Sequence, residues 1–445
     1  MNVTVHPGPV AGSIAIPGSK SHTIRALLIA SLAEGESRIA SALDSEDTSA
    51  CMDVLRHLGV EIAAAPQAAP GALDLTVRGR SGRYDAPSAT LDCRNSGTTL
   101  YLAMSIAALH DFPVRFDGDD QLRKRSAGPL LAALESAGAR VTREGTGDCV
   151  PFTIQGPITG GEVTISCPTS QYLSSLLLAA PLTPNGLTIH VPLLNERPYV
   201  QITLSWLESQ GIAYERRDWD RFTIPGGQRY RAFARPVPAD FSSATFFVVA
   251  AAVTGSELTL TGLDMADSQG DKEVVRIAER LGCTVRSGAE GLTIRGPGKA
   301  DAPLAGGDVD LNAIPDALPA LAILGTRCGR PLRLLNVPQA REKETDRIAV
   351  MAGAINALGG SAEELADGLV VHPGTLHGGA VDSVGDHRIA MAFAVAGLCA
   401  AGPITVTNAG VAGITFPGFY EKLASVGAQL TTEADAEPAP TPAKE

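Results

Sequence analysis

The sequence has few aromatic residues, no closely spaced cysteine pairs and no surplus of positive charge. Only 20 of its 445 residues are aromatic (11 Phe, 7 Tyr and 2 Trp), whereas 44% are hydrophobic. A hydrophobic fraction of this size excludes wholesale disorder, and the core must be mainly aliphatic. The 47 Gly residues exceed the usual share of ~7%. This composition favours many short elements joined by Gly turns.

The charge balance narrows the range of partners. Lys and Arg number 36 against 48 Asp and Glu, so the net charge is −12, without the basic surplus typical of nucleic-acid binders. An acidic chain can still hold a local basic pocket, so small anionic substrates stay open. The seven cysteines are scattered and form no C-x-x-C motif. We therefore expect no metal site, no disulfide scaffold and a reducing, cytoplasmic location.

Membrane and targeting signals are also missing. The first twenty residues lack the basic and apolar regions of a signal peptide. The longest apolar stretches, near Phe246–Val253 and Ile389–Ala401, are shorter than the ~18–20 residues of a membrane helix. Residues 431–445 are rich in Pro, Ala and charge, which predicts a disordered tail.

Two helix patterns recur six times each along the chain. The first, an apolar helix with a capping or turn-like start, begins near Ser21, Asn95, Ser170, Ser242, Pro315 and Asp386. The second ends in a glycine, a helix stop signal, at Gly59, Gly138, Gly211, Gly282, Gly359 and Gly427. The two series run in phase, so the sequence predicts six copies of an α/β unit of about 73 residues. Three copies per domain is the natural division, with the Pro-rich segment Phe233–Phe241 as a crossover.

Positive residues gather at the predicted helix starts. A helix N-terminus has free N–H groups and a positive dipole end, so a cation there is unfavourable unless an anion is bound. Any one of these cations reads as a solvated surface charge, but the set indicates a pocket for phosphate and carboxylate groups. Its members are Lys20, Arg25, Arg123, Lys124, Arg125, Lys343, Arg347 and Arg388.

Polar groups and two carboxylates accompany the cations. Helix capping explains one residue of Thr169-Ser170-Gln171 and one of Asn95–Thr99, and leaves the others free. Asp316 lies at a helix start among apolar residues, where a carboxyl can hold a proton near neutral pH; plain capping is its alternative. Glu344 lies between Lys343 and Arg347 and is either a base or the partner in an i,i+3 ion pair.

These residues carry a family resemblance. PGSKS-x-x-x-R, N-S-G-T, T-S-Q-Y-L, I-P-D-A, K-E-T-D-R, D-H-R and T-F-P occur in this order between about residues 3 and 430. Together they resemble the 5-enolpyruvylshikimate-3-phosphate synthase family. The resemblance implies a two-domain inside-out α/β barrel with three repeats per domain. The expected domains are residues 1–18 with 237–430, and residues 19–236.

The resemblance implies transfer of the enolpyruvyl group of phosphoenolpyruvate to the 5-hydroxyl of shikimate 3-phosphate. Phosphate leaves through a tetrahedral ketal, in the route to chorismate and the aromatic amino acids, without a cofactor or metal. We expect a monomer whose domains close on the acceptor. Two alternatives stay open: a related transferase with a different cyclic hydroxy acid, including one without a phosphate, and a non-catalytic anion-binding relative. A sister family acting on UDP-N-acetylglucosamine uses a loop Cys, which residues 118–125 lack.

The resemblance also implies a role for each matching residue. Asp316 would take the proton of the 5-hydroxyl, Glu344 would act as acid and base at the phosphoenolpyruvate methylene, and Lys20 and His387 would complete the catalytic set. Shikimate 3-phosphate would contact Lys20, Ser21, Arg25, Thr169, Ser170, Gln171, Tyr199, Asp316, Gln339 and Lys343. Phosphoenolpyruvate would contact Lys20, Gly97, Arg125, Gln171, Arg347 and Arg388.

The chain departs from the family pattern at several positions. Ile414 stands where a Lys usually precedes T-F-P, Gln339 replaces a common Asn, and His22–Ile24 replaces a polar stretch. Glu196 stands where a Ser usually binds the substrate phosphate. A carboxylate ~4 Å from a phosphate is repelled by about 4 kcal/mol per charge pair at an effective dielectric near 20. Glu196 therefore turns away, pairs with Arg197, or faces a substrate without that phosphate.

Overall fold

A computed structural model describes residues 1–68, 70–298 and 301–433. Its strands form six four-stranded sheets, and two α-helices accompany each sheet. One repeat shows the plan, with the sheet order β6-β7-β9-β8. It runs β6 (Leu91–Asp92), α3 (Gly97–Ala107), β7 (Val114–Asp117), α4 (Gly128–Ser136), β8 (Arg140–Arg143) and β9 (Phe152–Gln155). The first two strands are parallel because α3 crosses between them, and the remaining pairs are antiparallel.

The other repeats follow the same plan. The continuous half, residues 20–237, also contains α1 (Lys20–Leu32), β3 (Glu34–Leu43), α2 (Glu46–His57), β4 (Glu61–Pro66), β5 (Ala72–Arg80), β10 (Gly161–Cys167), α5 (Ser170–Ala179), β11 (Leu187–Leu194), α6 (Arg197–Ser209), β12 (Glu215–Arg217), β13 (Arg221–Ile224) and β14 (Ala234–Pro236).

The discontinuous half, residues 1–16 with 239–433, holds the remaining repeats. Its elements are β1 (Asn2–Val5), β2 (Ala11–Ala15), α7 (Phe241–Thr254), β15 (Glu257–Thr261), α8 (Glu273–Arg280), β16 (Thr284–Gly288), β17 (Gly291–Arg295), β18 (Gly307–Asp310), α9 (Leu318–Gly325), β19 (Leu332–Leu335), α10 (Arg347–Ala357), β20 (Ser361–Leu365), β21 (Gly368–His372), β22 (Gly379–Asp382), α11 (His387–Cys399), β23 (Ile404–Thr407), α12 (Phe419–Ser425) and β24 (Leu430–Glu433).

Each half is closed by strands from distant parts of the sequence. β14 pairs with β3, and β2 pairs with β15, so each supplies the first strand of a sheet whose other strands lie elsewhere in the chain. β1 lies between β23 and β24. The prediction of a tail from residue 431 is therefore wrong for Thr431–Glu433, because backbone pairing with β1 holds these residues in β24. The rest of the predicted tail lies outside the described residues.

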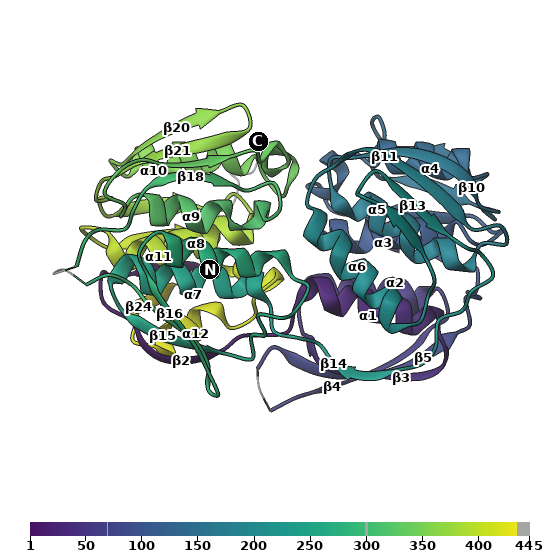
Figure 1. The fold of residues 1–445 in the computed structure, drawn as a ribbon, viewed down its shortest axis with the longest axis horizontal. Coiled ribbons are helices and arrows are strands. Elements are labelled where there is room, and N and C mark those ends of the chain that lie inside the picture. Colours follow the sequence, from purple (N-terminus) through teal and green to yellow (C-terminus); the bar gives the residue numbers. More distant parts are fainter. Residues whose placement is uncertain (69, 299–300, 434–445) are drawn as a thin grey trace, which may run out of the picture.

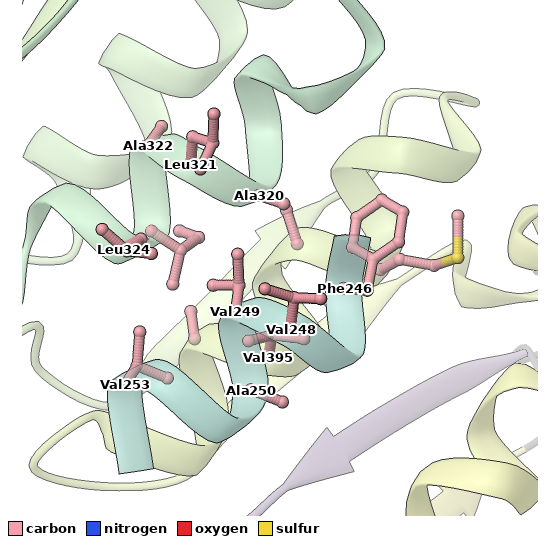
Figure 2. Close-up of a cluster of buried hydrophobic side chains, with 14 of the residues drawn as sticks. Phe246, Val248, Val249, Ala250, Val253, Ala320, Leu321, Ala322, Leu324 and Val395 are labelled. Atoms are coloured by element: carbon pink, nitrogen blue, oxygen red, sulfur yellow. The ribbon is translucent and has the colours of Figure 1, made fainter. Parts of the chain in front are cut away.

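Helices fill the interior of each half, and sheets surround them (Figure 1). In α7 every residue from Phe241 to Val253 is buried, and α9 and α11 pack against it (Figure 2). This confirms the inside-out α/β fold and explains why these helices are apolar on all sides. The buried hydrophobic residues form two clusters, one from Ile24 to Val237 and one from Val3–Ile16 and Ala239–Ala428. The domain limits stay a prediction, and the two clusters support it.

The six predicted glycine stops all lie just after helices and have a positive φ. Their φ angles are +85° at Gly59, +107° at Gly138, +70° at Gly211, +117° at Gly282, +77° at Gly359 and +101° at Gly427. An L-residue avoids this region because its Cβ approaches the following carbonyl oxygen. The surplus of glycine is thus partly a requirement of the repeat itself. Among the described residues, no helix is long and apolar enough to cross a membrane.

Replacing Gly211 with Ala should destabilise the protein by about 1–2 kcal/mol through backbone strain alone. An added Cβ at Gly211 meets no atom within 4 Å, so steric clash does not contribute. Gly353 is the matched control, because it lies inside α10 with the same open space and no positive φ. Gly353→Ala should stabilise by about 1 kcal/mol. Equal shifts of the urea midpoint in the two variants would contradict this explanation.

Candidate functional site

The starts of the buried helices converge on a cavity of about 570 Å³ lined by both halves of the chain. Thirteen of the predicted site residues line it: Lys20, Ser21, Arg25, Gly97, Arg125, Thr169, Ser170, Gln171, Tyr199, Asp316, Gln339, Lys343 and Glu344. Arg388 lines a small adjoining cavity with Lys20, Ser21, Tyr199 and Asp316. The repeat explains this convergence, because each copy directs the N-terminus of one buried helix toward the same place.

Arg347 is the centre of the charged network. Its guanidinium is 1% exposed and donates to three carboxylates. Nη1 lies 2.8 Å from Asp316 Oδ1, Nε lies 2.8 Å from Asp386 Oδ2, and Nη2 contacts Glu344. Burial lowers the pKa of Arg347, but Asp386, Glu344 and Asp316 outweigh burial and raise it above its ordinary value. The guanidinium therefore stays charged and fixes the spacing of Asp316 and Glu344.

Cations surround Asp316, so the expectation of an apolar environment that keeps it protonated is wrong. Arg388 Nη2 lies 2.8 Å from Asp316 Oδ2, opposite the contact with Arg347. Burial raises the pKa of Asp316, but Arg388, Lys343 and Arg347 together hold it well below its ordinary value. Asp316 is therefore an ionised carboxylate, ready to accept a proton or to orient a hydroxyl.

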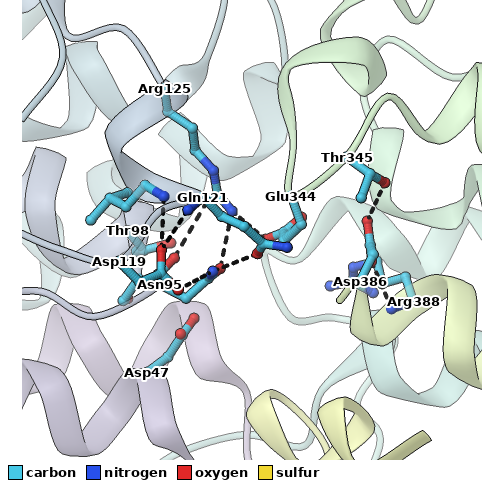
Figure 3. A network of polar contacts seen from close by, with 12 residues as sticks. Asp47, Asn95, Thr98, Asp119, Gln121, Arg125, Glu344, Thr345, Asp386 and Arg388 are labelled. Carbon is cyan, nitrogen blue, oxygen red and sulfur yellow. Dashed lines mark hydrogen bonds and ion pairs between the residues drawn. The ribbon is translucent and has the colours of Figure 1, made fainter. Parts of the chain in front are cut away.

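Glu344 is also held ionised. It forms the i,i+3 pair with Arg347, and its Oε1 lies 3.6 Å from Arg125 Nη2 of the other half (Figure 3). Burial raises its pKa, but Arg347, Arg125, His387 and Lys20 lower it well below the ordinary value. A ligand anion that draws these cations away would raise the pKa of Glu344 again.

Arg125 is oriented by the turn before α3. Its Nη2 donates to Asn95 Oδ1 at 3.0 Å, and Asn95 Nδ2 donates to Asp119 and Gln121 (Figure 3). A Cβ added to Gly97 would lie 3.2 Å from Arg125 Nη1. The glycine therefore lets the guanidinium lie directly against the start of α3.

Several predicted ligands have partners within the protein. Lys20 Nζ lies 3.0 Å from Asp47 Oδ2. Arg25 is buried and donates to Thr203 Oγ1 and to the carbonyls of Ser21 and Tyr199, and burial lowers its pKa to about 10. Arg25 thus joins α1 to α6, and its contact with a substrate stays a proposal.

Other predicted ligands lie where the two halves meet. Tyr199 Oη donates to Asp271 Oδ2 at 2.8 Å, across the halves. Burial, with help from Asp316 and Asp240, raises the pKa of Asp271 to about 7. Gln171 Nε2 donates to Thr98 Oγ1 at 3.1 Å, and Gln339 Nε2 donates to the carbonyl of Asn312 at 3.0 Å.

Glu196 neither turns away from the cavity nor pairs with Arg197. Its carboxylate accepts hydrogen bonds from Thr169, from Ser170 and from Lys343 Nζ at 2.6 Å. Arg197 is exposed and lies 6.0 Å from the ring of Trp219. Burial lowers the pKa of Lys343, but Glu196 and Asp316 outweigh burial and raise it.

Sequence reasoning missed the acidic partners of the site. Asp47 pairs with Lys20, Asp271 binds Tyr199, and Asp386 caps α11 and binds Arg347. Asp386 was visible as the first residue of D-H-R, but its cap position concealed the contact with α10. Ile414 ends a 3₁₀ turn, Ala409–Ile414, and is not among the residues that line the main cavity. No described group of three or more His, Cys, Asp or Glu side chains is placed to hold a metal ion.

Known proteins match the chain over nearly its full length. A family model described as EPSP synthase (3-phosphoshikimate 1-carboxyvinyltransferase) matches residues 5–423. The chain belongs to this family. It is 44% identical to the 3-phosphoshikimate 1-carboxyvinyltransferase of Acetivibrio thermocellus and 42% identical to that of Ruminiclostridium cellulolyticum. These alignments cover 97% of this chain and 100% and 99% of the relatives.

Solved structures of the EPSP synthase family share the fold. The EPSP synthase of Acinetobacter baumannii superposes with a TM-score of 0.79 at 26% identity, covering 97% of this chain and 100% of that one. A second structure of EPSP synthase from the same organism gives a TM-score of 0.80 and covers 98% of this chain. The EPSP synthase fold expected from the sequence motifs is thereby confirmed.

His387 should make stability depend on pH below neutrality. Both ring nitrogens are buried and lack a hydrogen-bond partner among the described residues. Burial lowers the pKa of His387 to about 3, with Arg388 and Lys20 adding to it and Glu344 and Asp386 opposing. Between the ordinary pKa of ~6.5 and about 3, only the unfolded chain binds the proton. This contribution to stability is complete above ~6.5 and is lost as the pH falls.

His387→Gln should therefore flatten the dependence of unfolding free energy on pH between ~6 and ~4.5 by about 1.4 kcal/mol per pH unit. Urea titrations at several pH values measure the slope. His57→Gln is the control, because His57 is exposed on α2. Parallel slopes for wild type and His387→Gln would refute the neutral, buried state of this ring.

Proposed function

We propose that the chain transfers the enolpyruvyl group of phosphoenolpyruvate to the 5-hydroxyl of shikimate 3-phosphate and releases phosphate. One observation carries this proposal: two ionised carboxylates, Asp316 and Glu344, are bound to one buried guanidinium, that of Arg347, beside a cavity lined by cations. Such a site offers two proton-transfer groups and preorganised charge for anionic substrates. Family membership and the names of the relatives support the same reaction.

The two carboxylates divide the proton transfers. In the addition step the 5-oxygen bonds to C2 of phosphoenolpyruvate, Asp316 takes the hydroxyl proton, and Glu344 gives a proton to C3. The product is a tetrahedral ketal with a methyl group. In the elimination step Glu344 takes a proton back from that methyl group, the bond from C2 to the phosphate oxygen breaks, and the enol ether and phosphate are released.

The electrostatics of Glu344 suit both directions of transfer. Its low pKa results from Arg347, Arg125, His387 and Lys20. A phosphoenolpyruvate anion shared among these groups weakens their hold on Glu344 and favours its protonation. The substrate thus creates the acid that it needs, and loss of phosphate returns Glu344 to the carboxylate form.

Further expectations stay predictions at this point. They are the monomeric state, the cytoplasmic location, closure of the two halves on the acceptor, and the individual contacts of Ser21, Arg25, Gly97, Gln171 and Arg388 with substrate. Closure is supported by the contacts that already cross between the halves, such as Glu344 with Arg125 and Lys343 with Glu196.

Purified protein should release phosphate from phosphoenolpyruvate when shikimate 3-phosphate is present. Asp316→Asn and Glu344→Gln should each lower kcat by about 10²- to 10⁴-fold, because each removes one proton-transfer group. A coupled phosphate assay measures the rate, and circular dichroism confirms folding. Asp308→Asn is the control, since Asp308 pairs with Arg333 on the surface. The proposal fails if folded wild-type protein releases no phosphate, and the roles fail if either site variant keeps full activity.

A further inference from the structure

The carboxylate of Glu196 is buried at one end of the main cavity. Glu196 is 2% exposed and precedes α6 with a left-handed backbone, at φ 58° and ψ 38°. Its backbone N–H donates to the carbonyl of Asn312 of the other half at 3.2 Å. This conformation directs the side chain back toward α5 instead of along its own helix.

Glu196 fills an anion site with the protein's own charge. Oε2 accepts from Thr169 Oγ1 at 3.1 Å, from Ser170 N at 3.0 Å and from Ser170 Oγ at 2.9 Å. Oε1 accepts from Lys343 Nζ at 2.6 Å. Two hydroxyls, the N-terminal N–H of a helix and an ammonium are donors that suit a phosphate group. Here all four donate to a carboxylate.

A second acceptor faces the same end of the cavity. Gln339 Nε2 donates to the Asn312 carbonyl, which also accepts the backbone N–H of Glu196. This bond fixes the amide so that Oε1 is its free oxygen. That oxygen is buried and has no hydrogen-bond partner among the described residues, and Gln339 lines the cavity. A buried acceptor without a partner favours a ligand group that donates a hydrogen bond.

A phosphate and a hydroxyl differ in how they meet these two acceptors. A phosphate dianion offers only acceptor oxygens, so it must either displace Glu196 from its four donors or bind beside a like charge. A hydroxyl donates to Glu196 or to Gln339 Oε1 and leaves the existing bonds in place. The charge at this subsite therefore opposes the phosphate and tolerates the free hydroxyl.

We infer that Glu196 is a specificity-determining residue that occupies the acceptor's phosphate subsite, so that a cyclic hydroxy acid with a free hydroxyl at that position is also an acceptor. The inference rests on the proposed function, because it concerns the second substrate of that reaction. It extends the acceptors from shikimate 3-phosphate to the unphosphorylated acid. Glu196 acts by holding Lys343, Thr169 and Ser170, not by touching the reacting atoms.

The test compares shikimate 3-phosphate with shikimate as acceptors of the enolpyruvyl group. Wild type should turn over both. Glu196→Ser should raise the ratio of kcat/KM for the phosphorylated over the unphosphorylated acceptor by about ten- to a hundred-fold, mainly through KM. Glu196→Gln keeps the shape without the charge and should shift the ratio in the same direction by less. Glu342→Gln, which removes an exposed carboxylate at the rim of the same cavity, should leave the ratio unchanged.

Calorimetric titration of both acceptors into the same proteins separates the failures. Normal turnover with the same ratio in wild type and both Glu196 variants would overturn the inference and leave the proposed function standing. Absence of turnover, with tighter binding of shikimate 3-phosphate in Glu196→Ser, would refute the proposed function and support the inference. Unchanged binding, or no binding of either acceptor, overturns the inference.

Discussion

The site depends on one buried cation, the guanidinium of Arg347. Three carboxylates from three segments of the chain bind it, and Asp386 is itself completely buried. Removing one partner of such a buried network costs about 3–5 kcal/mol, because it leaves an uncompensated charge. Arg347 therefore does more than contact a substrate. It keeps Asp316 and Glu344 ionised and at a fixed separation, which the two proton transfers require.

The remaining cations follow the same rule at lower burial. Lys20 pairs with Asp47, Arg388 with Asp316, and Lys343 with Glu196. A substrate anion that enters this cavity joins or exchanges with ion pairs that already exist. Recognition is then a matter of which internal carboxylates yield and which remain, and this makes Glu196 as important for selectivity as the cations around it.

Much of the fold was readable from the sequence, because the repeat is written in local signals. The positive φ at Gly211 and its five counterparts requires glycine, and buried helices such as α7 are apolar on every face. The exchange of β1, β2 and β14 between distant segments was not readable, since strand pairing is not local. The cations at helix starts located the cavity, but their partners were hidden. Asp316 seemed apolar in sequence because Arg347 and Arg388 reach it from other helices. Glu196 was recognised as a departure, and only the fold showed which donors hold it.

The exchange of hydrogen at C3 of phosphoenolpyruvate tests the central claim most directly. In D₂O, with phosphoenolpyruvate and shikimate 3-phosphate as substrates, Glu344 should deliver deuterium to C3 during addition and later remove hydrogen from the resulting methyl group. Nuclear magnetic resonance of the product should therefore show deuterium in its methylene with wild type, and Glu344→Gln should form neither product nor exchanged substrate at a comparable rate. Product formed without deuterium, or rapid exchange in Glu344→Gln, would contradict the account.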